Sequence, residues 1–528
     1  MAAIKEKMQW PPMGILEWKM SEHSAWYTGD AEILANYYSL YSNVNNLGLS
    51  YPLHNENFWG RQLKNQGEIF AHVNVAGDIA ETSANLLFSE SPIIRIAQAQ
   101  KEGISRYKGT QEVLDKMLMD SSVNFFRKII EAAESASAMG GVYIKICWDD
   151  ELSEFPLPVV MQADRAIPEF KFGVLCAVTF WTEYKASSNE SDKVYRLLER
   201  YEFGKIINTL YFGTGSNLGY VVDLGAIDET KELIAEVVTP LNELLAVYVP
   251  NMLPNRLNRN SYIGRSDYSG IEGMMDSLDE IYSNWVRNIV LAQPRVIVPE
   301  SYLAKKDGKK HYNYDEMIYV QMDIDPISEG SGSRVTLQQF EIKADQYEKS
   351  ALNFLERIVT SAGYSPQSFG LNIQGSAESG TALNIRERKS IATRNKKQNY
   401  WGSALKQIIY LMLVIYKTNL KGKVELDSEV NISFSDGLTN SLSEVSSAVK
   451  MISDAIAAST ETKVRLIHPE WDEEQIKKEA EAINKENGIG EMSNPDGMNL
   501  DTFELDEEKK DAEAKSKANK GTKSVGEK

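Results

Sequence analysis

The chain has 528 residues, more than one hydrophobic core usually supports, so we expect several structural regions or one elongated subunit of several parts. Hydrophobic residues make up 42% and charged residues 25%, which is typical of a globular protein and excludes a largely disordered chain. The formal net charge of -18 excludes a protein that holds nucleic acid by coating phosphates with Lys and Arg over its whole surface.

The cysteine content and the apolar runs of the sequence indicate in which cellular compartment the chain folds. The two cysteines, Cys147 and Cys176, lie inside apolar runs that read as strands, so we expect neither a disulfide framework nor a cysteine-based zinc site, and a reducing compartment fits. Residues 1–18 lack the continuous apolar core of a signal peptide. The apolar run 408–416 is about half the ~20 residues of a membrane span, which favours a buried helix.

Residues 31–140 are predicted to be mainly helical, because apolar residues recur there at three- and four-residue spacing. The three helical stretches are 36–44, 73–88 and 110–141, and Gly140-Gly141 ends the last of them. From residue 142 the period changes to two, which predicts an antiparallel strand meander. Its six stretches are 143–148, 157–163, 169–184, 193–203, 205–215 and 219–224.

A helical pattern returns over residues 271–293, stopped by Pro294, and again over 342–362, stopped by Gly363. The segment 294–340 between them has strand-like stretches and a basic turn. These features predict a compact β module carried between two similar helices.

The last third of the chain begins with residues 366–380, which are rich in Gly and Ser and have no period. Residues 381–418 then predict one helix of about 38 residues, or a kinked pair with Gly402 at the kink. A short strand within 424–434 and two helices within 440–486 are expected to follow, the second opening at Pro469-Glu470. The charged, small-residue composition after Gly488 predicts a disordered tail.

Several of these segments, in their order along the chain, resemble the portal proteins of siphovirus-type tailed bacteriophages, the SPP1-like portal family. One is the early helix and Pro-containing strand VNVAGDIAETSANLLFSESPIIRI, and another is MQADRAIPEFKFG before the strand meander. A third, GRSDYSGIEGMMDSLDEIYSNW, leads into the first of the two similar helices. SGTALNIRERKS and HPEWDEEQIKKEAEAINKE are similar to the start of the long helix and to the late helices of that family.

The resemblance implies a mixed α+β fold in an elongated subunit, with an α/β wing, a two-helix stem, a small β-containing clip, a long tunnel-side helix and a helical crown. The implied regions, in chain order, are an N-terminal segment (1–30), the wing (31–265), the first stem helix (266–293), the clip (294–340), the second stem helix (341–363), the tunnel loop (364–380), the long kinked helix (381–423), a wing strand (424–438), the crown helices (439–488) and the tail (489–528).

The resemblance also implies a function, which is not enzymatic. Twelve subunits would form a ring at one capsid vertex, assembled in the host cytoplasm and retained in the virion, as the channel for packaging and ejection of double-stranded DNA. The implied partners are the terminase large subunit, the head-completion adaptor, and the major capsid and scaffolding proteins. No cofactor, metal or membrane is expected. Twelve copies would carry 12 × -18 = -216 formal charges, so binding must depend on local surfaces.

Three groups of residues are candidates for these surfaces. The first group is a run of small and polar residues whose backbone can adopt many conformations. It is either a plain connector or, as the resemblance implies, the tunnel loop that touches DNA. Its members are Gln374, Gly375, Ser376, Ala377, Glu378, Ser379 and Gly380.

The second group is basic and opens the long helix, where a solvated face, ion pairs between subunits and contact with DNA phosphates all remain open. It comprises Arg386, Arg388, Lys389, Arg394, Lys396 and Lys397. The third group flanks Asp307-Gly308, the signature of a hairpin, and is either a solubilising turn or, at the clip, a docking surface. It comprises Lys305, Lys306, Lys309 and Lys310.

An enzyme is the alternative from another class. Asp149 or Asp150 with Glu169 and Lys171 has the outline of a metal-dependent nuclease site, although turn carboxylates and an alternating strand explain these residues equally well. Two serine-lysine spacings lack a companion motif, and none of the five histidines is spaced as a metal pair. Another head or tail structural protein is the second alternative.

Overall fold

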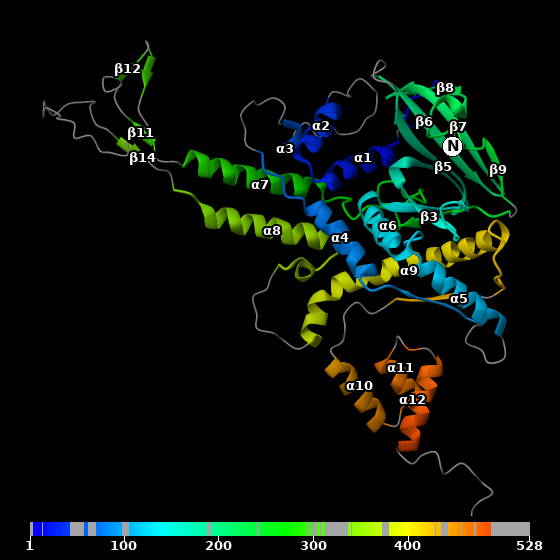
Figure 1. Cartoon of the computed structure of the whole chain (residues 1–528). Helices are drawn as coiled ribbons and strands as arrows, with labels where there is room; N and C mark the ends of the chain where they lie inside the picture. The colour runs from blue at the N-terminus through cyan, green and yellow to red at the C-terminus, as the bar shows by residue number, and fades with distance from the viewer. Residues whose placement is uncertain are drawn as a thin grey trace, which may run out of the picture. The chain divides into compact units, whose positions relative to one another are not determined.

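The structure is a computed structural model in which helices and sheets alternate along the chain (Figure 1). It describes residues 4–12, 14–42, 58–61, 70–97, 105–186, 192–239, 242–292, 295–297, 304–306, 309–311, 336–338, 341–371, 380–427, 429–434, 442–455, 457–468, 471 and 473–486. The chain splits into two units, Met1–Gly437 and Leu438–Lys528.

The predicted early helices are present, with two additional helices and one break. The helices of this region are α1 (Ile15–Thr28), α2 (Ala31–Ser42), α3 (Phe58–Arg61), α4 (Val75–Phe88), α5 (Ser105–Met119) and α6 (Phe125–Met139). The sequence pattern did not predict α1 or α3, and it merged α5 with α6. The break falls where the Asp120 carboxylate accepts the backbone N–H of Ser122 and Val123, which competes with continued helix.

The strands after α6 are antiparallel, as predicted, but they form two sheets rather than one meander. The first sheet has the order β10-β2-β3, from β2 (Gly141–Cys147), β3 (Leu157–Gln162) and β10 (Ala246–Pro250). The second has the order β4-β5-β6-β7-β8, with β9 also on β7. Its strands are β4 (Ala166–Lys171), β5 (Val174–Lys185), β6 (Lys193–Glu202), β7 (Lys205–Thr214), β8 (Asn217–Val222) and β9 (Glu236–Val238).

One stretch predicted as a single strand, 169–184, is instead the hairpin β4–β5. Phe172 and Gly173 turn the chain with φ values of 54° and 86°, a left-handed conformation that an extended strand does not contain. The segment β15 (Val430–Ser433) confirms the short strand predicted within 424–434, and it pairs with β1 (Ile93–Ile96) from the other end of the unit.

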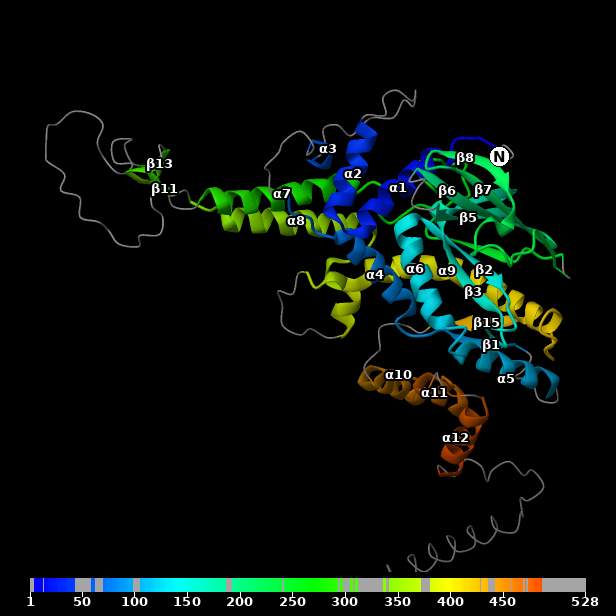
Figure 2. The ribbon, with the colours of Figure 1, turned by 45° about the horizontal axis from the view of Figure 1, so that its top comes forward.

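The two similar helices are α7 (Glu272–Leu291) and α8 (Ala344–Ala362), which lie side by side in both views (Figures 1 and 2). Between them, β11 (Arg295–Ile297) pairs with β14 (Thr336–Gln338), and β12 (Ala304–Lys306) pairs with β13 (Lys309–His311). The strand-like stretch 317–324 lies outside the described residues. The predicted β insert between two helices is thus present in its described part.

The long helix α9 (Gly380–Thr418) is continuous over 39 residues, and its N-terminal part is turned relative to the rest (Figures 1 and 2). Its apolar run is a buried helix, as predicted: Ile408, Met412 and Val414 are fully buried against the β10-β2-β3 sheet and neighbouring segments. Among the described residues, no helix has the length and apolar character that crossing a membrane requires.

The second unit contains α10 (Leu442–Asp454), α11 (Thr460–Ile467) and α12 (Glu473–Glu486), where the sequence pattern predicted two helices. Ser459 explains the extra boundary, because its side chain accepts the backbone N–H of Thr462 and so caps α11. The expected disordered tail after Gly488 lies outside the described residues.

The N-terminal segment covers the open edge of the larger sheet. The backbone N–H of Lys7 donates to the Gly219 carbonyl at 2.8 Å, and Leu218 donates to the Met8 carbonyl at 3.0 Å. Trp10 packs edge-on against Trp181 with 5.7 Å between ring centroids. Residues 4–10 therefore protect the β8 edge, which would otherwise offer unpaired backbone groups to another strand.

Replacing Gly219 by Ala tests the backbone conformation of β8. Gly219 has φ +79°, and an added Cβ would lie 1.8 Å from the Phe212 carbonyl oxygen. We expect Gly219→Ala to lower the free energy of unfolding by about 2 kcal/mol, measured by urea denaturation. The matched control is Gly215→Ala in the same β7–β8 hairpin, where an added Cβ meets nothing within 4 Å. Equal effects of the two substitutions would contradict this account.

Candidate functional site

The centre of the first unit is a buried ion pair between Asp267 and Lys397. Asp267 lies shortly before α7, and Lys397 lies on α9. The Lys397 Nζ atom is 2.5 Å from Asp267 Oδ2, and both side chains are only 2% exposed. Two charges removed from water in this way are stable only when their remaining hydrogen-bonding capacity is satisfied.

Further donors satisfy the Asp267 carboxylate. Ser137 Oγ on α6 donates at 2.7 Å, Asn251 Nδ2 at 2.9 Å, and the Tyr364 hydroxyl after α8 at 2.7 Å. Lys397 also donates to Ser83 Oγ on α4 at 2.6 Å. Burial alone would favour neutral Asp267, but the charge and hydrogen bond of Lys397, with those of Ser137 and Asn251, outweigh it and hold the pKa below its ordinary value.

The basic group on α9 is divided between the interior and the surface. Lys397 belongs to the buried pair, and Arg394, 7% exposed, donates from Nε to the Leu86 carbonyl at 2.7 Å. For these two residues, the expectation of a channel or intersubunit surface is wrong. Helical spacing is the reason, because both fall on the face of α9 that is buried along with Ser390 and Trp401.

The other four basic residues, Arg386, Arg388, Lys389 and Lys396, are exposed. Lys389 donates to the Thr360 carbonyl at the end of α8. The surface interpretations of this group therefore apply to these four only.

Of the other two candidate groups, the first lies almost wholly outside the described residues, whereas the backbone of the four lysines in the second is described. Residues 374–379 are outside the described residues, and Gly380 is the first residue of α9. The basic turn is a β12–β13 pair with Lys305 opposite Lys310 and Lys306 opposite Lys309. This pairing agrees with the hairpin expected from the sequence.

A second polar cluster, which the sequence did not reveal, lies on α7. The Asp276 carboxylate accepts the backbone N–H of Phe58 at 2.8 Å and of Trp59 at 3.1 Å. Asp279 accepts Trp59 Nε1 at 3.0 Å and the backbone N–H of Val73 at 2.9 Å, and it lies 2.8 Å from His72 Nδ1. Two buried carboxylates thus hold the segment before α4 against α7.

Two carboxyl groups in the first turns of α7, those of Glu272 and Asp276, have pKa values shifted in opposite directions. Burial opposes ionisation of Glu272, but the hydrogen bond and charge of His23 and the charge of Lys19 outweigh it and lower the pKa to about 2. Burial raises the pKa of Asp276 to about 6, since its backbone donors offset desolvation only in part and Asp279 adds repulsion.

The proposed nuclease outline is not assembled in the structure. Glu169 Oε1 is 2.6 Å from Arg200 Nη1, so its charge is used in a salt bridge within the sheet. In the described ranges, no group of three His, Cys, Asp or Glu side chains is arranged to hold a metal ion.

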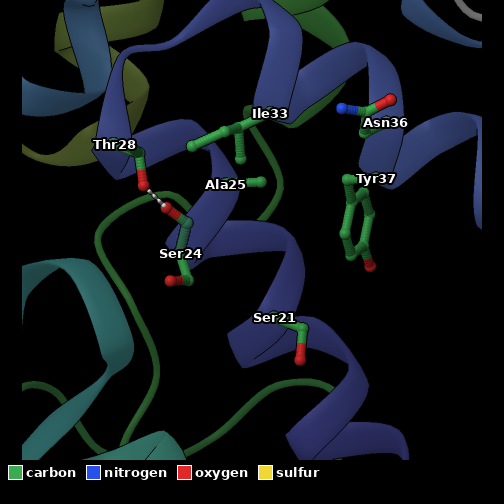
Figure 3. Close-up of a pocket in the computed structure, with 7 residues that line it drawn as sticks. All are labelled: Ser21, Ser24, Ala25, Thr28, Ile33, Asn36 and Tyr37. Carbon is green, nitrogen blue, oxygen red and sulfur yellow. Dashed lines mark hydrogen bonds between the residues drawn. The ribbon is translucent and has the colours of Figure 1, made fainter. Parts of the chain in front are cut away.

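A pocket of about 300 Å³ lies between α1 and α2 (Figure 3). Hydroxyl, amide and apolar side chains line it, and Thr28 Oγ1 donates to the Ser24 carbonyl at 2.8 Å. The lining contains no carboxylate, imidazole or amine, so this pocket offers no group for proton transfer near neutral pH.

Comparison with known proteins assigns the family. The family model described as phage portal protein, SPP1 Gp6-like, matches residues 18–488. The chain therefore belongs to the SPP1 Gp6-like phage portal protein family, whose members are structural proteins rather than enzymes. Its function is that of a portal protein, as the sequence resemblance predicted.

Two further comparisons complete this picture. A comparison with curated proteins gives no match. The solved structure titled "Neck of empty GTA particle computed with C6 symmetry" is similar with a TM-score of 0.41 and 10% identity, over 77% of this chain and 92% of that chain. A TM-score this low carries no weight for the fold or function of this chain.

Removing the buried ammonium tests the role of the central ion pair. Lys397→Met leaves Asp267 without its counter-charge, so we expect the free energy of unfolding to fall by about 3–5 kcal/mol. Lys396→Met, next to it on the exposed side of α9, is the matched control and should change stability by less than about 0.5 kcal/mol. Urea denaturation measures both. A loss of similar size in the two variants would refute the central role of the pair.

The pH dependence of stability tests the environment of Asp276. Because its folded-state pKa of about 6 lies above the ordinary value of 3.8, the Asp276 carboxylate takes up a proton at a higher pH in the folded chain than in the unfolded chain. Its contribution to stability therefore grows as the pH falls from 7 through 6. Relative to Asp276→Asn, the unaltered chain should gain about 1 kcal/mol between pH 7 and 5. Urea denaturation of both proteins at both pH values measures this, and a pH-independent difference between them would disprove it.

Proposed function

We propose that twelve copies of this chain form a ring at one vertex of the phage capsid, and that double-stranded DNA is packaged and ejected through the ring. The family assignment over residues 18–488 supports this proposal. Charge supports a passive conduit, because a subunit with a net charge of -18 does not bind the duplex over its whole surface. The role is mechanical, and ATP hydrolysis belongs to a separate motor.

The α7–α8 pair is the observation that most directly favours assembly. Three consecutive apolar residues at the end of α7, Ile289, Val290 and Leu291, are 48%, 44% and 42% exposed. Leu352 on α8 is 44% exposed. Two helices alone cannot cover apolar side chains on several faces, and such residues are normally buried against further helices. Neighbouring copies in a ring would supply them.

The proposed architecture follows the family arrangement. In it, α7 and α8 form the stem (266–293 and 341–363), the β insert forms the clip (294–340), and residues 31–265 form the wing. The pairing of β15 with β1 supports placing 424–438 in the wing. The remaining regions are the N-terminal segment (1–30), the tunnel loop (364–380), the long helix (381–423), the crown (439–488) and the tail (489–528).

The proposed partners contact different regions of the subunit. The clip, with Lys305, Lys306, Lys309 and Lys310, would bind the terminase large subunit during packaging and the head-completion adaptor afterwards. Residues 374–380 would touch the moving duplex. The major capsid and scaffolding proteins would contact the ring during assembly in the host cytoplasm. In the finished virion, the protein would lie at the portal vertex.

Electron microscopy of the purified protein tests the ring directly. We expect two-dimensional class averages to show rings with a central hole wide enough for a duplex. A protein that remains monomeric at high concentration would contradict the proposal.

A double substitution on α7 tests the assembly surface. Val290→Asp with Leu291→Asp places two charges where packing between copies is proposed, so rings should be lost while the subunit stays folded. Met119→Asp with Leu152→Asp is the matched control, because these residues are 79% and 70% exposed and lie at the end of α5 and between β2 and β3. Native mass spectrometry and circular dichroism report assembly and folding. Rings that persist in the α7 variant would exclude this surface as the contact.

A further inference from the structure

The exposed face of α9 has an unusual charge distribution. Residues 388–424 contain no Asp or Glu, whereas the whole chain has 75 acidic residues in 528, a frequency that would place about five in a segment of this length. The same segment contains nine Lys and Arg residues. A strongly acidic chain therefore has one long helix in which Glu387, near the N-terminus, is the single acidic residue.

Between Arg388 and Tyr410 the exposed residues lie on one face of the helix. Lys389 is also exposed, but it donates to the Thr360 carbonyl and is left out of the set below. The spacing of three and four residues among the others repeats from the N-terminal part of α9 to its middle, so they share one side of the helix cylinder. They are Arg388, Ala392, Asn395, Lys396, Asn399, Ser403, Lys406, Gln407 and Tyr410. We call this set the α9 stripe. From Arg388 to Tyr410 it extends about 33 Å at 1.5 Å per residue.

The cations of the α9 stripe are not used within the subunit. In the part of the chain that the structure describes, Arg388, Lys396 and Lys406 form no salt bridge and have no other polar partner. The cations that do have structural roles, Arg394 and Lys397, point into the interior instead. The α9 stripe is therefore not explained by the stability of the fold.

The stripe also differs from an ordinary solvated helix face. On α8 the exposed charges include both signs, with Asp345, Glu348, Lys349 and Arg357. Mixed signs are the usual solution for solubility. The α9 stripe combines Lys and Arg with amide, hydroxyl and phenol groups, which is the set of side chains that contact the phosphate oxygens of DNA.

A second copy of the chain is the less suitable occupant. Protein–protein interfaces are enriched in aromatic and aliphatic side chains at their centre and depleted of Lys. The stripe offers only Ala392 and the half-covered Tyr410, 38% exposed, as apolar contacts. Its length of about 33 Å matches one turn of a B-form duplex, about 34 Å.

We infer that the α9 stripe is a phosphate-binding surface for double-stranded DNA, with Arg388, Lys396 and Lys406 as the charged contacts. This inference rests on the proposed function, because it takes the duplex that the ring conducts as the partner. It confines DNA binding to one local surface on an otherwise acidic subunit. Weak, sequence-independent contacts of this kind would hold the duplex without fixing its register.

Fluorescence anisotropy with a labelled 30-base-pair duplex, titrated at salt concentrations between about 50 and 200 mM, tests this surface. The test variant is Arg388→Gln, Lys396→Gln and Lys406→Gln. The matched control is Lys116→Gln, Lys171→Gln and Lys231→Gln, which also removes three positive charges, but from exposed positions outside α9. The test variant should bind at least about tenfold more weakly, with a salt slope smaller by about three, and the control should bind like the unaltered protein.

Three results would overturn the inference. They are no salt-dependent binding by the unaltered protein, equal binding by both variants, and loss of rings in the test variant with unchanged DNA binding. The last result would identify a second copy as the partner. Ring formation is measured separately, by electron microscopy. If rings form normally but the duplex does not bind through α9, this inference is wrong and the proposed function still stands.

Discussion

The first unit depends on the buried pair of Asp267 and Lys397. An isolated charge in this position would be strongly destabilising, so each partner requires the other, and together they require Ser83, Ser137 and Tyr364 around them. The residues come from α4, α6, α9 and the segments next to α7 and α8. One interaction thus fixes where the two long antiparallel helices leave the body and how α9 crosses it.

The same need to satisfy buried charge fixes the N-terminal region. Asp276 and Asp279 on α7 accept backbone N–H groups from Phe58, Trp59 and Val73, which lie about two hundred residues earlier in the chain. The first half of α7 is thereby buried. Its second half and the N-terminal half of α8 remain largely exposed, which is the arrangement expected of a pair of helices completed by neighbouring copies.

Charge on α9 is divided by helix geometry. The buried face carries Ser390, Arg394 and Lys397, and the exposed face carries positions 388, 392, 396 and 399. In each set the residues are three or four apart, which is the spacing of one helix face. Cations that look equivalent in the sequence therefore have opposite roles. The inner ones stabilise the subunit, and three of the outer ones, Arg388, Lys396 and Lys406, are those that we infer contact DNA.

Sequence alone determined the portal resemblance, the two long helices around a β insert, the long helix α9 and the antiparallel strands, because hydrophobic periodicity and turn residues are local signals. Only the tertiary structure showed that residues 143–162 and 166–222 belong to separate sheets, that β1 pairs with β15, and that Arg394 and Lys397 are buried. These facts depend on which distant segments meet. A lone Asp267 carries no local pattern, and its partner Lys397 looks like any surface lysine until the fold brings the two together.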